Sequence, residues 1–264
     1  MIIDYHIHTK YSDGNCSHRD IVNLAIDQGV SEIGFTDHYG IYPNDWTASE
    51  EALPALVEEV LSLKEEFKDR ISILLGLEVD YYPEKEEETK AILSKYPFDY
   101  LMGSIHFVDG DNFDSDPNHP IYTKYSIDTL YEKYYDTLIK AINSGMFTTM
   151  SHLDLIKKYN YVSSKDLSEL YYKIARLLVD KDIMVEYNTS GYSRPCKDFF
   201  PSDEITSILI KEGVKFTIGS DTHTQDHLLR NYAMAKERLK KLGLKNIYRY
   251  GGKAPISIDT FMSK

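Results

Sequence analysis

Short apolar segments alternate with amphipathic helical patterns along almost the whole chain. Each apolar segment is typical of a buried strand, and between the segments apolar side chains recur at helical spacing, which predicts helices with one buried face. Repeated strand–helix units imply parallel strands joined by right-handed crossovers. The predicted strands lie near residues 1–8, 31–37, 71–79, 99–106, 147–152, 182–188 and 214–220.

Side chains of the kind that bind metals stand at the C-terminal ends of these strands. In a closed α/β barrel these ends converge on one mouth, where active sites are built. An open doubly wound sheet also fits the alternation, but such a sheet usually draws on few strands for its site. The placement favours a TIM-like (β/α)7 barrel, with a candidate eighth, partial strand at 244–250. The residues concerned are His6, His8, His38, Glu78, His106, His152, Asp221 and His223.

Several helix boundaries can be predicted from capping residues. Ser17 and Asp20 have the spacing of a capping box, and Gly29 is expected to end that helix. Thr47 and Glu50 predict a second capping box. A later helix is expected to open at Ser202 and to close at Gly213.

Length, charge and cysteine content narrow the class of protein. The 264 residues suit one α/β domain spanning 1–264. The net charge of −12 argues against a nucleic-acid partner, which needs clustered Lys and Arg. Cys16 and Cys196 show no CxxC pattern, so we expect a reducing compartment. With no signal-peptide pattern and no apolar run of about 18 residues, the expectation is a cytoplasmic protein without a membrane segment.

The chemistry of the strand-end residues points to a cluster of metal ions. On a strand, His6 and His8 share one face, and so do Asp221 and His223. Glu78 has two oxygens and could bridge two ions, and Asp13 could reach the same mouth from the turn after the first strand. Imidazole and carboxylate ligands suit Zn, Mn or Fe(II). Nine ligands exceed the four of one tetrahedral ion, so two or three divalent ions are predicted.

A cationic side chain beside this mouth would complete a phosphate site. A cluster of ions generates hydroxide at neutral pH and holds the attacking and leaving oxygens of a phosphate ester. Arg194 follows the sixth strand and offers a guanidinium fork that matches phosphate oxygens, with Lys158 and Lys157 as weaker candidates for a second anchor. The irregular segments 39–46 and 108–125 are candidate lids. We expect surface roles for the remaining histidines, His18, His119 and His227.

Seven short motifs together resemble one family. DYHIHTKYSDG, FTDH, GLEVDY, GSIHF, SHLDLIKKY, NTSG and GSDTH are similar, in this order from residue 2 to about 225, to the PHP (polymerase and histidinol phosphatase) superfamily, and most of all to its stand-alone histidinol-phosphate phosphatases. The resemblance implies a distorted (β/α)7 barrel with a trinuclear metal centre.

The resemblance also implies residue roles. One ion would be held by His6, His8, Glu78 and Asp221, a second by Glu78, His106 and His152, and a third by Asp13, His38 and His223. Asp221 would also contact the hydroxide that bridges the ions, and Arg194 matches an arginine that anchors the substrate phosphate. Many members carry His one position beyond Asp13, so the third site here departs from the family pattern.

The expected function is that of a metal-dependent phosphomonoesterase acting on L-histidinol phosphate in histidine biosynthesis. An alternative within the superfamily is a phosphatase for another small phosphate ester, such as a nucleotide or a sugar phosphate. A nuclease is disfavoured by the acidic charge, and a non-enzymatic metal-binding module by the complete ligand set. The sequence makes no prediction of oligomeric state.

Overall fold

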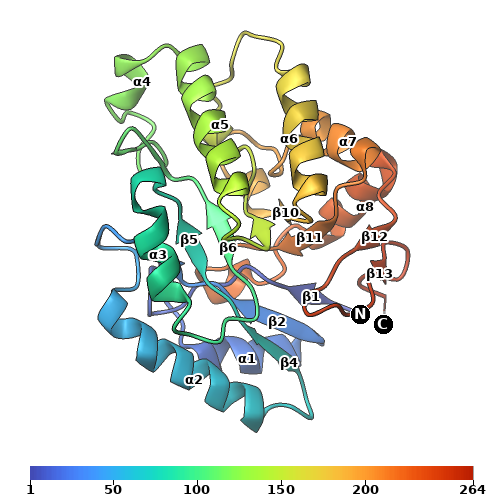
Figure 1. Ribbon diagram of the computed structural model, residues 1–264. Helices are drawn as coiled ribbons and strands as arrows, with labels where there is room; N and C mark the ends of the chain where they lie inside the picture. Colours follow the sequence, from blue (N-terminus) through green and yellow to red (C-terminus); the bar gives the residue numbers. More distant parts are fainter. Residues whose placement is uncertain (264) are drawn as a thin grey trace.

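Parallel strands surround the centre of the molecule in the computed structural model, which describes residues 1–263 (Figure 1). One sheet has the order β1-β2-β4 and a second has the order β11-β10-β9-β6-β5-β3, with all pairs parallel. The strands of the first sheet are β1 (Ile3–Asp4), β2 (Glu32–Phe35) and β4 (Ser72–Leu75). Those of the second are β3 (His38–Tyr39), β5 (Glu78–Asp80), β6 (Met102–Ser104), β9 (Thr149–Met150), β10 (Met184–Asn188) and β11 (Phe216–Gly219).

The two sheets are parts of one barrel. β3 continues the chain of β2 after two residues, and β5 continues β4 in the same way. The ring closes where Ile7 and Thr222 form a parallel bridge, supported by a 2.8 Å hydrogen bond from the His8 N–H to the Thr222 carbonyl. The predicted seven-strand, TIM-like barrel is confirmed, and its second and third strand segments are each interrupted by two residues.

An aromatic cluster adjoins one of these breaks. Tyr100 stacks on Tyr250 with ring centroids 3.9 Å apart, and its hydroxyl donates a 2.8 Å hydrogen bond to the Tyr5 carbonyl. Gly34 and Gly76 lie against the Tyr100 ring, where an added Cβ would collide with it. The two glycines therefore leave the space that the buried tyrosine occupies.

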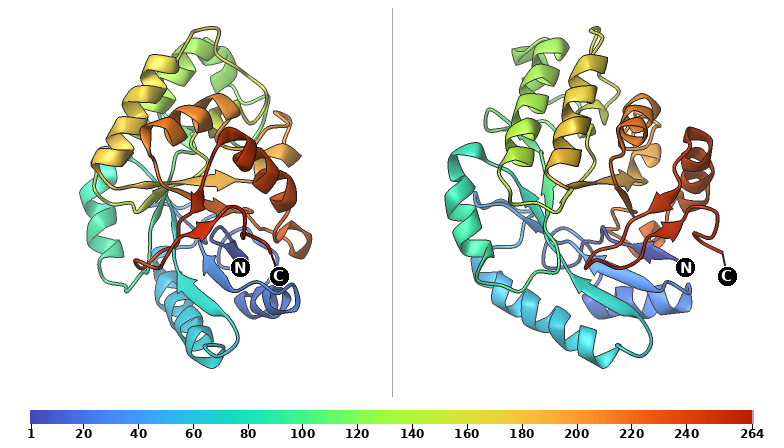
Figure 2. Two further views of the ribbon diagram at one scale, coloured as in Figure 1. Left: turned by 90° about the vertical axis from the view of Figure 1, so that its right-hand side faces the viewer. Right: turned by 45° about the vertical axis from the view of Figure 1, so that its right-hand side comes forward.

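Helices cover the outside of the barrel (Figure 2). Two short antiparallel hairpins are added to it, β7 (Phe107–Val108) with β8 (Asp111–Asn112), and β12 (Asn246–Ile247) with β13 (Ile256–Ser257). Among the described residues no helix has both the length and the apolar content needed to cross a membrane. The helices are α1 (His18–Asp27), α2 (Leu53–Glu66), α3 (Glu86–Leu93), α4 (Ile121–Lys124), α5 (Ile127–Asn143), α6 (Ser168–Asp180), α7 (Asp203–Glu212) and α8 (Tyr232–Leu242).

Two boundary predictions are confirmed. Ser17 and Asp20 form the predicted capping box of α1, which ends just before Gly29. Ser202 caps α7, and Gly213 ends it in the left-handed conformation with φ +85°.

One other prediction is wrong, and another is confirmed only in part. The Thr47–Glu50 capping box does not form, because α2 begins only at Leu53 after a short 3₁₀ turn over Glu50–Ala52. Pro54 stands in the first turn of α2, where a residue without an N–H is favoured, and this explains the later start. The eighth strand predicted at 244–250 exists as β12, but it pairs antiparallel with β13 and the barrel closes without it.

Candidate metal centre

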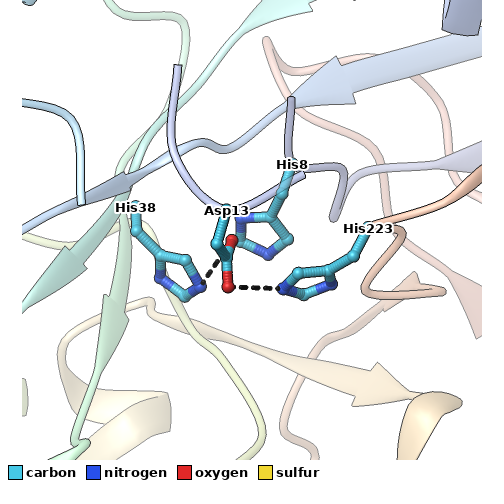
Figure 3. A group of neighbouring side chains, drawn as sticks. All are labelled: His8, Asp13, His38 and His223. Atoms are coloured by element: carbon cyan, nitrogen blue, oxygen red, sulfur yellow. Dashed lines mark ion pairs between the residues drawn. The ribbon is translucent and has the colours of Figure 1, made fainter. Parts of the chain in front are cut away.

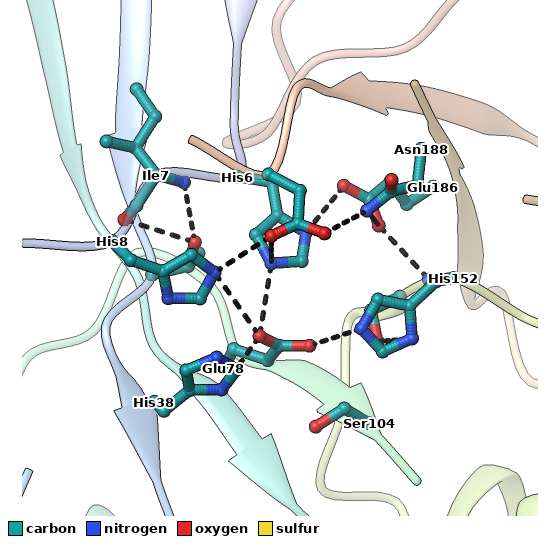
Figure 4. Close-up of polar contacts among 12 residues, drawn as sticks. His6, Ile7, His8, His38, Glu78, Ser104, His152, Glu186 and Asn188 are labelled. Carbon is teal, nitrogen blue, oxygen red and sulfur yellow. Dashed lines mark hydrogen bonds and ion pairs between the residues drawn. The ribbon is translucent and has the colours of Figure 1, made fainter. Parts of the chain in front are cut away.

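The nine predicted ligand side chains meet at the C-terminal mouth of the barrel, as parallel strands whose ends converge would place them. Figure 4 shows part of this cluster around Glu78, and Figure 3 shows the part nearest to solvent. Most of the nine are buried, whereas Asp13 is exposed and His223 is half-buried. The cluster is therefore open on the side of Asp13.

Glu78 lies at the middle of the cluster. Its Oε2 is 3.1 Å from His6 Nε2 and 3.0 Å from His38 Nδ1, and its Oε1 is 2.9 Å from His152 Nε2. The residue starts β5, and its side chain is fully buried. Because its two oxygens face different imidazoles, this carboxylate has the arrangement that a bridging ligand requires.

The outer part of the cluster surrounds Asp13. Its Oδ2 is 3.2 Å from His223 Nε2, and its Oδ1 is 3.8 Å from His38 Nε2 (Figure 3). The ring of His8 stacks on that of His38 with centroids 4.1 Å apart. On the inner side, His8 Nε2 is 3.4 Å from Asp221 Oδ1.

The residues fit divalent ions by chemistry and by geometry. Neither ring nitrogen of His8 makes a hydrogen bond within residues 1–263 despite its complete burial, and Glu78 Oε1 has only its 2.9 Å ion-pair contact with His152 Nε2. Buried polar atoms are normally hydrogen-bonded, so these unpartnered atoms suit a metal. In each of three sets of residues, the potential ligand atoms, one from each residue, all lie within 4.8 Å of one another. The sets are His8, Asp13, His38 and His223; His6, His8 and Asp221; and His38, Glu78 and His106. The family resemblance implied a different grouping of these ligands. In the structure, His8 also belongs to the set around Asp13, and His38 lies with Glu78 and His106.

Neighbouring imidazoles keep the two central carboxylates of the cluster in their anionic form. Burial would raise the pKa of Glu78, but the imidazoles of His6 and His38 outweigh it and hold that pKa well below its usual range. Burial would also raise the pKa of Asp221, but the imidazoles of His6 and His8 outweigh this effect and hold that pKa well below its usual range. Burial, reinforced by His8, holds the pKa of His38 well below its ordinary value. Both carboxylates are thus anionic and His38 is neutral at pH 7, which are the forms that bind metals.

Asp221 has a backbone conformation that is uncommon outside glycine. Its φ is +55°, and Arg230 donates hydrogen bonds of 2.8 and 2.6 Å to the carbonyls of Ser220 and Asp221. The Oδ2 of Asp221 accepts a 2.8 Å hydrogen bond from Ser190 Oγ. Strained residues persist only where their surroundings hold them, and they concentrate at functional sites. No motif in the sequence indicates these contacts of Arg230.

A cavity of about 380 Å³ opens beside the cluster. Arg194 lines it, and its guanidinium makes no hydrogen bond or ion pair with residues 1–263. Lys158 also lines it, but its ammonium is 2.6 Å from Asp114 Oδ1. Lys157 turns away and is buried against Asp154 and Asp198 at 2.9 and 2.8 Å, so the interpretation of Lys157 as a phosphate anchor is wrong.

The three remaining histidines differ from one another. His119 is half-buried in the segment before α4, and its Nδ1 accepts a hydrogen bond from the Ile121 N–H. His227 is also half-buried and lines the cavity. The surface role predicted for His18 is wrong, because its ring is fully buried between Asp37 at 3.1 Å and Glu59 at 3.2 Å.

The His18–Asp37 pair supports the turn that carries Asp13. Asp37 also accepts hydrogen bonds from the Thr9 N–H at 2.6 Å and from Ser12 Oγ at 2.7 Å. The two carboxylates beside His18 outweigh its burial and raise its pKa to about 9.

Both predicted lid segments reach the cavity. Trp46 lines it from the first, with its ring 4.7 Å from that of His38 in an edge-to-face contact. Asn112, Asp114 and Ser115 line it from the second. The cavity thus joins the candidate metal ligands to a polar rim.

Comparison with known proteins identifies the class to which this barrel and its site belong. The PHP domain family matches residues 4–190, which is more than half of the chain. The chain belongs to the PHP family.

Similar proteins include two that are named as histidinol-phosphatases. The chain is 28% identical over 250 residues to a probable histidinol-phosphatase of Deinococcus radiodurans, covering 92% of this chain and 94% of that one. It is 28% identical over 258 residues to a histidinol-phosphatase of Lactococcus lactis, with coverage of 95% and 94%. A crystal structure of histidinol phosphate phosphatase from Lactococcus lactis, complexed with zinc, L-histidinol and phosphate, superimposes with a TM-score of 0.83 at 25% identity over 97% of this chain and 99% of that one.

Proposed function

We propose that this chain is a metal-dependent phosphomonoesterase that hydrolyses L-histidinol phosphate to L-histidinol and phosphate. The observation that carries the proposal is a buried cluster of imidazoles and carboxylates with unpartnered donor atoms, next to a cavity lined by an uncommitted arginine. The near full-length similarity to a structure that contains zinc, L-histidinol and phosphate supports this substrate.

Two or three divalent ions, Zn, Mn or Fe, would be held by His6, His8, Asp13, His38, Glu78, His106, His152, Asp221 and His223. When bound, they supply hydroxide from water at neutral pH and offset negative charge on the phosphoryl group. Glu78 would join two of the sites, since its two oxygens face imidazoles on opposite sides.

The remaining steps belong to the chain's own side chains. Arg194 would bind the phosphate oxygens with its guanidinium fork, and Lys158 would assist while it shares its charge with Asp114. Asp221 would accept a hydrogen bond from the attacking water, because its low pKa keeps it anionic and Ser190 fixes its other oxygen. Trp46 and the polar rim would limit access of bulk water to the cavity.

A panel of phosphate esters tests the substrate. We expect kcat/KM for L-histidinol phosphate to exceed that for a nucleoside monophosphate, a sugar phosphate and p-nitrophenyl phosphate by at least about tenfold, which is 1.4 kcal/mol of discrimination. Equal values across the panel would indicate a phosphatase for other small esters, and no phosphate release from any of them would contradict the proposed reaction.

A further inference from the structure

A carboxylate outside the nine candidate ligands lies beneath the metal centre. Glu186 is in the middle of β10 and is fully buried. Its Oε1 is 2.6 Å from His6 Nδ1, on the side of the ring opposite to the nitrogen that faces Glu78 (Figure 4). Gly219 leaves room for this contact, because a Cβ there would collide with both Glu186 Oε1 and His6 Cβ.

The second oxygen of Glu186 is committed to two other donors. Its Oε2 accepts hydrogen bonds of 3.1 Å from the His152 N–H and 3.1 Å from Asn188 Nδ2. The Asn188 amide cannot rotate to relieve this arrangement, because its Oδ1 accepts a 2.9 Å hydrogen bond from the Ser190 N–H. The Oε2 position must therefore be occupied by an acceptor.

We propose that Glu186 is a positioning residue that fixes the tautomer of His6, an inference that rests on the proposed metal centre. Glu186 accepts the proton of His6 Nδ1, so in the metal-bound protein Nε2 would offer its lone pair to an ion on the side of Glu78 and Asp221. The same carboxylate holds the backbone of His152, and it thereby ties two candidate ligands from different strands to one buried group.

Glu186→Gln tests this proposal because it keeps the shape of the side chain and changes one oxygen into an NH₂ group. The amide oxygen must take the Oε2 position, where two donors meet it. The NH₂ group then faces His6 Nδ1, which can accept it only when the ring proton sits on Nε2. That tautomer presents an N–H where the lone pair is needed.

Asp80→Asn is the matched control. Asp80 Oδ1 contacts His106 Nδ1 at 2.5 Å and accepts from Ser104 Oγ at 3.4 Å, but its Oδ2 has no hydrogen-bond partner within residues 1–263. An asparagine can therefore keep its oxygen toward His106 and place its NH₂ at the free position. The two substitutions make the same chemical change beside a buried histidine, and only one of them reverses the tautomer.

Zinc affinity, measured on the full chain by competition with a chromophoric chelator, is the readout. Glu186→Gln should weaken binding of one equivalent of zinc by about tenfold to a hundredfold or more, and Asp80→Asn by less than about tenfold. Histidine ¹⁵N spectra of the zinc-loaded wild type should show the His6 proton on Nδ1. Wild-type affinity in Glu186→Gln, or an equal loss in both variants, would overturn the proposal.

Two further measurements distinguish a folding defect of a variant from a specific loss of zinc binding. The metal-free variants should keep a wild-type circular dichroism spectrum and a cooperative unfolding transition. If Glu186→Gln does not fold, Glu186→Asp serves as the second variant. It keeps both acceptor oxygens but is one methylene shorter, so it should bind zinc more weakly than the wild type. Wild-type zinc affinity in Glu186→Asp would equally refute the role of Glu186. If the wild type itself binds no zinc, the proposed function fails, which is a different outcome from equal binding by wild type and variant.

Discussion

Removing the Arg194 guanidinium should weaken substrate binding while leaving the fold and the metal content unchanged. The side chain lines the cavity without a hydrogen bond or ion pair to residues 1–263, so Arg194→Ala leaves no buried partner unsatisfied. The free energy of unfolding should therefore change by less than about 0.5 kcal/mol, as for an ordinary surface substitution. We therefore expect the substitution to weaken only the interaction of the enzyme with the phosphate group of the substrate.

The magnitude follows from the bond that is lost. A charge-assisted hydrogen bond contributes about 1.5–3 kcal/mol, which corresponds to roughly a tenfold to over a hundredfold decrease in kcat/KM. KM should rise because the phosphate is bound in the ground state, and kcat should fall as well if the contact tightens during the reaction. Arg194→Lys should recover only part of the loss, since the charge remains and the fork does not.

Lys158→Ala is the comparison. Its ammonium is already 2.6 Å from Asp114 Oδ1 and donates a 2.9 Å hydrogen bond to the Asp114 carbonyl, so its removal should cost less than that of Arg194. Steady-state kinetics of phosphate release, with metal analysis of each variant, give the result. A wild-type kcat/KM in Arg194→Ala would show that Arg194 does not bind the phosphate and that the ions or Lys158 bind it instead.

Three further predictions concern the metal centre and its support. Glu78→Ala should lower metal occupancy and turnover together, because Glu78 faces imidazoles with both oxygens; unchanged occupancy would remove it from the site. Chelation should lower Tm by several degrees, because ions that bind only the folded state stabilise it by mass action; an unchanged Tm under chelation would argue against bound ions. Because the pKa of His18 is raised to about 9, the His18–Asp37 pair stabilises the fold fully below about pH 6.5 and loses this effect as the pH rises through 9, by up to about 3 kcal/mol. Denaturant unfolding from pH 6 to 9.5 should show this loss in the wild type but not in His18→Gln, and parallel profiles would contradict the interpretation.

The positions of the candidate ligands could be predicted because they depend on strand ends. A His or Glu near the C-terminal end of a strand segment is brought to the mouth by the topology itself, and His38 and Glu78 reach it on the short strands β3 and β5 that follow the breaks. The sequence could not distinguish Lys157 from Lys158, because a short 3₁₀ turn over Leu155–Lys157 directs one toward Asp198 and the other toward the cavity.

The supporting contacts could not be predicted, because they join residues far apart in the chain. Nothing local shows that His18, in the first turn of a helix, is buried against Asp37 and Glu59. Glu186 did carry one usable signal, since a carboxylate inside a buried strand needs a partner. The sequence alone did not identify that partner as His6, which is 180 residues away.

The central claim is that the clustered side chains hold divalent ions on which hydrolysis of L-histidinol phosphate depends. Chelated protein should be titrated with zinc or manganese while bound metal and phosphate release from L-histidinol phosphate are measured on the same samples. We expect no release without metal and a rate that rises with occupancy to a plateau at about two to three equivalents per chain. Full activity in the metal-free protein, or binding of less than about one equivalent under metal-replete conditions, would contradict it.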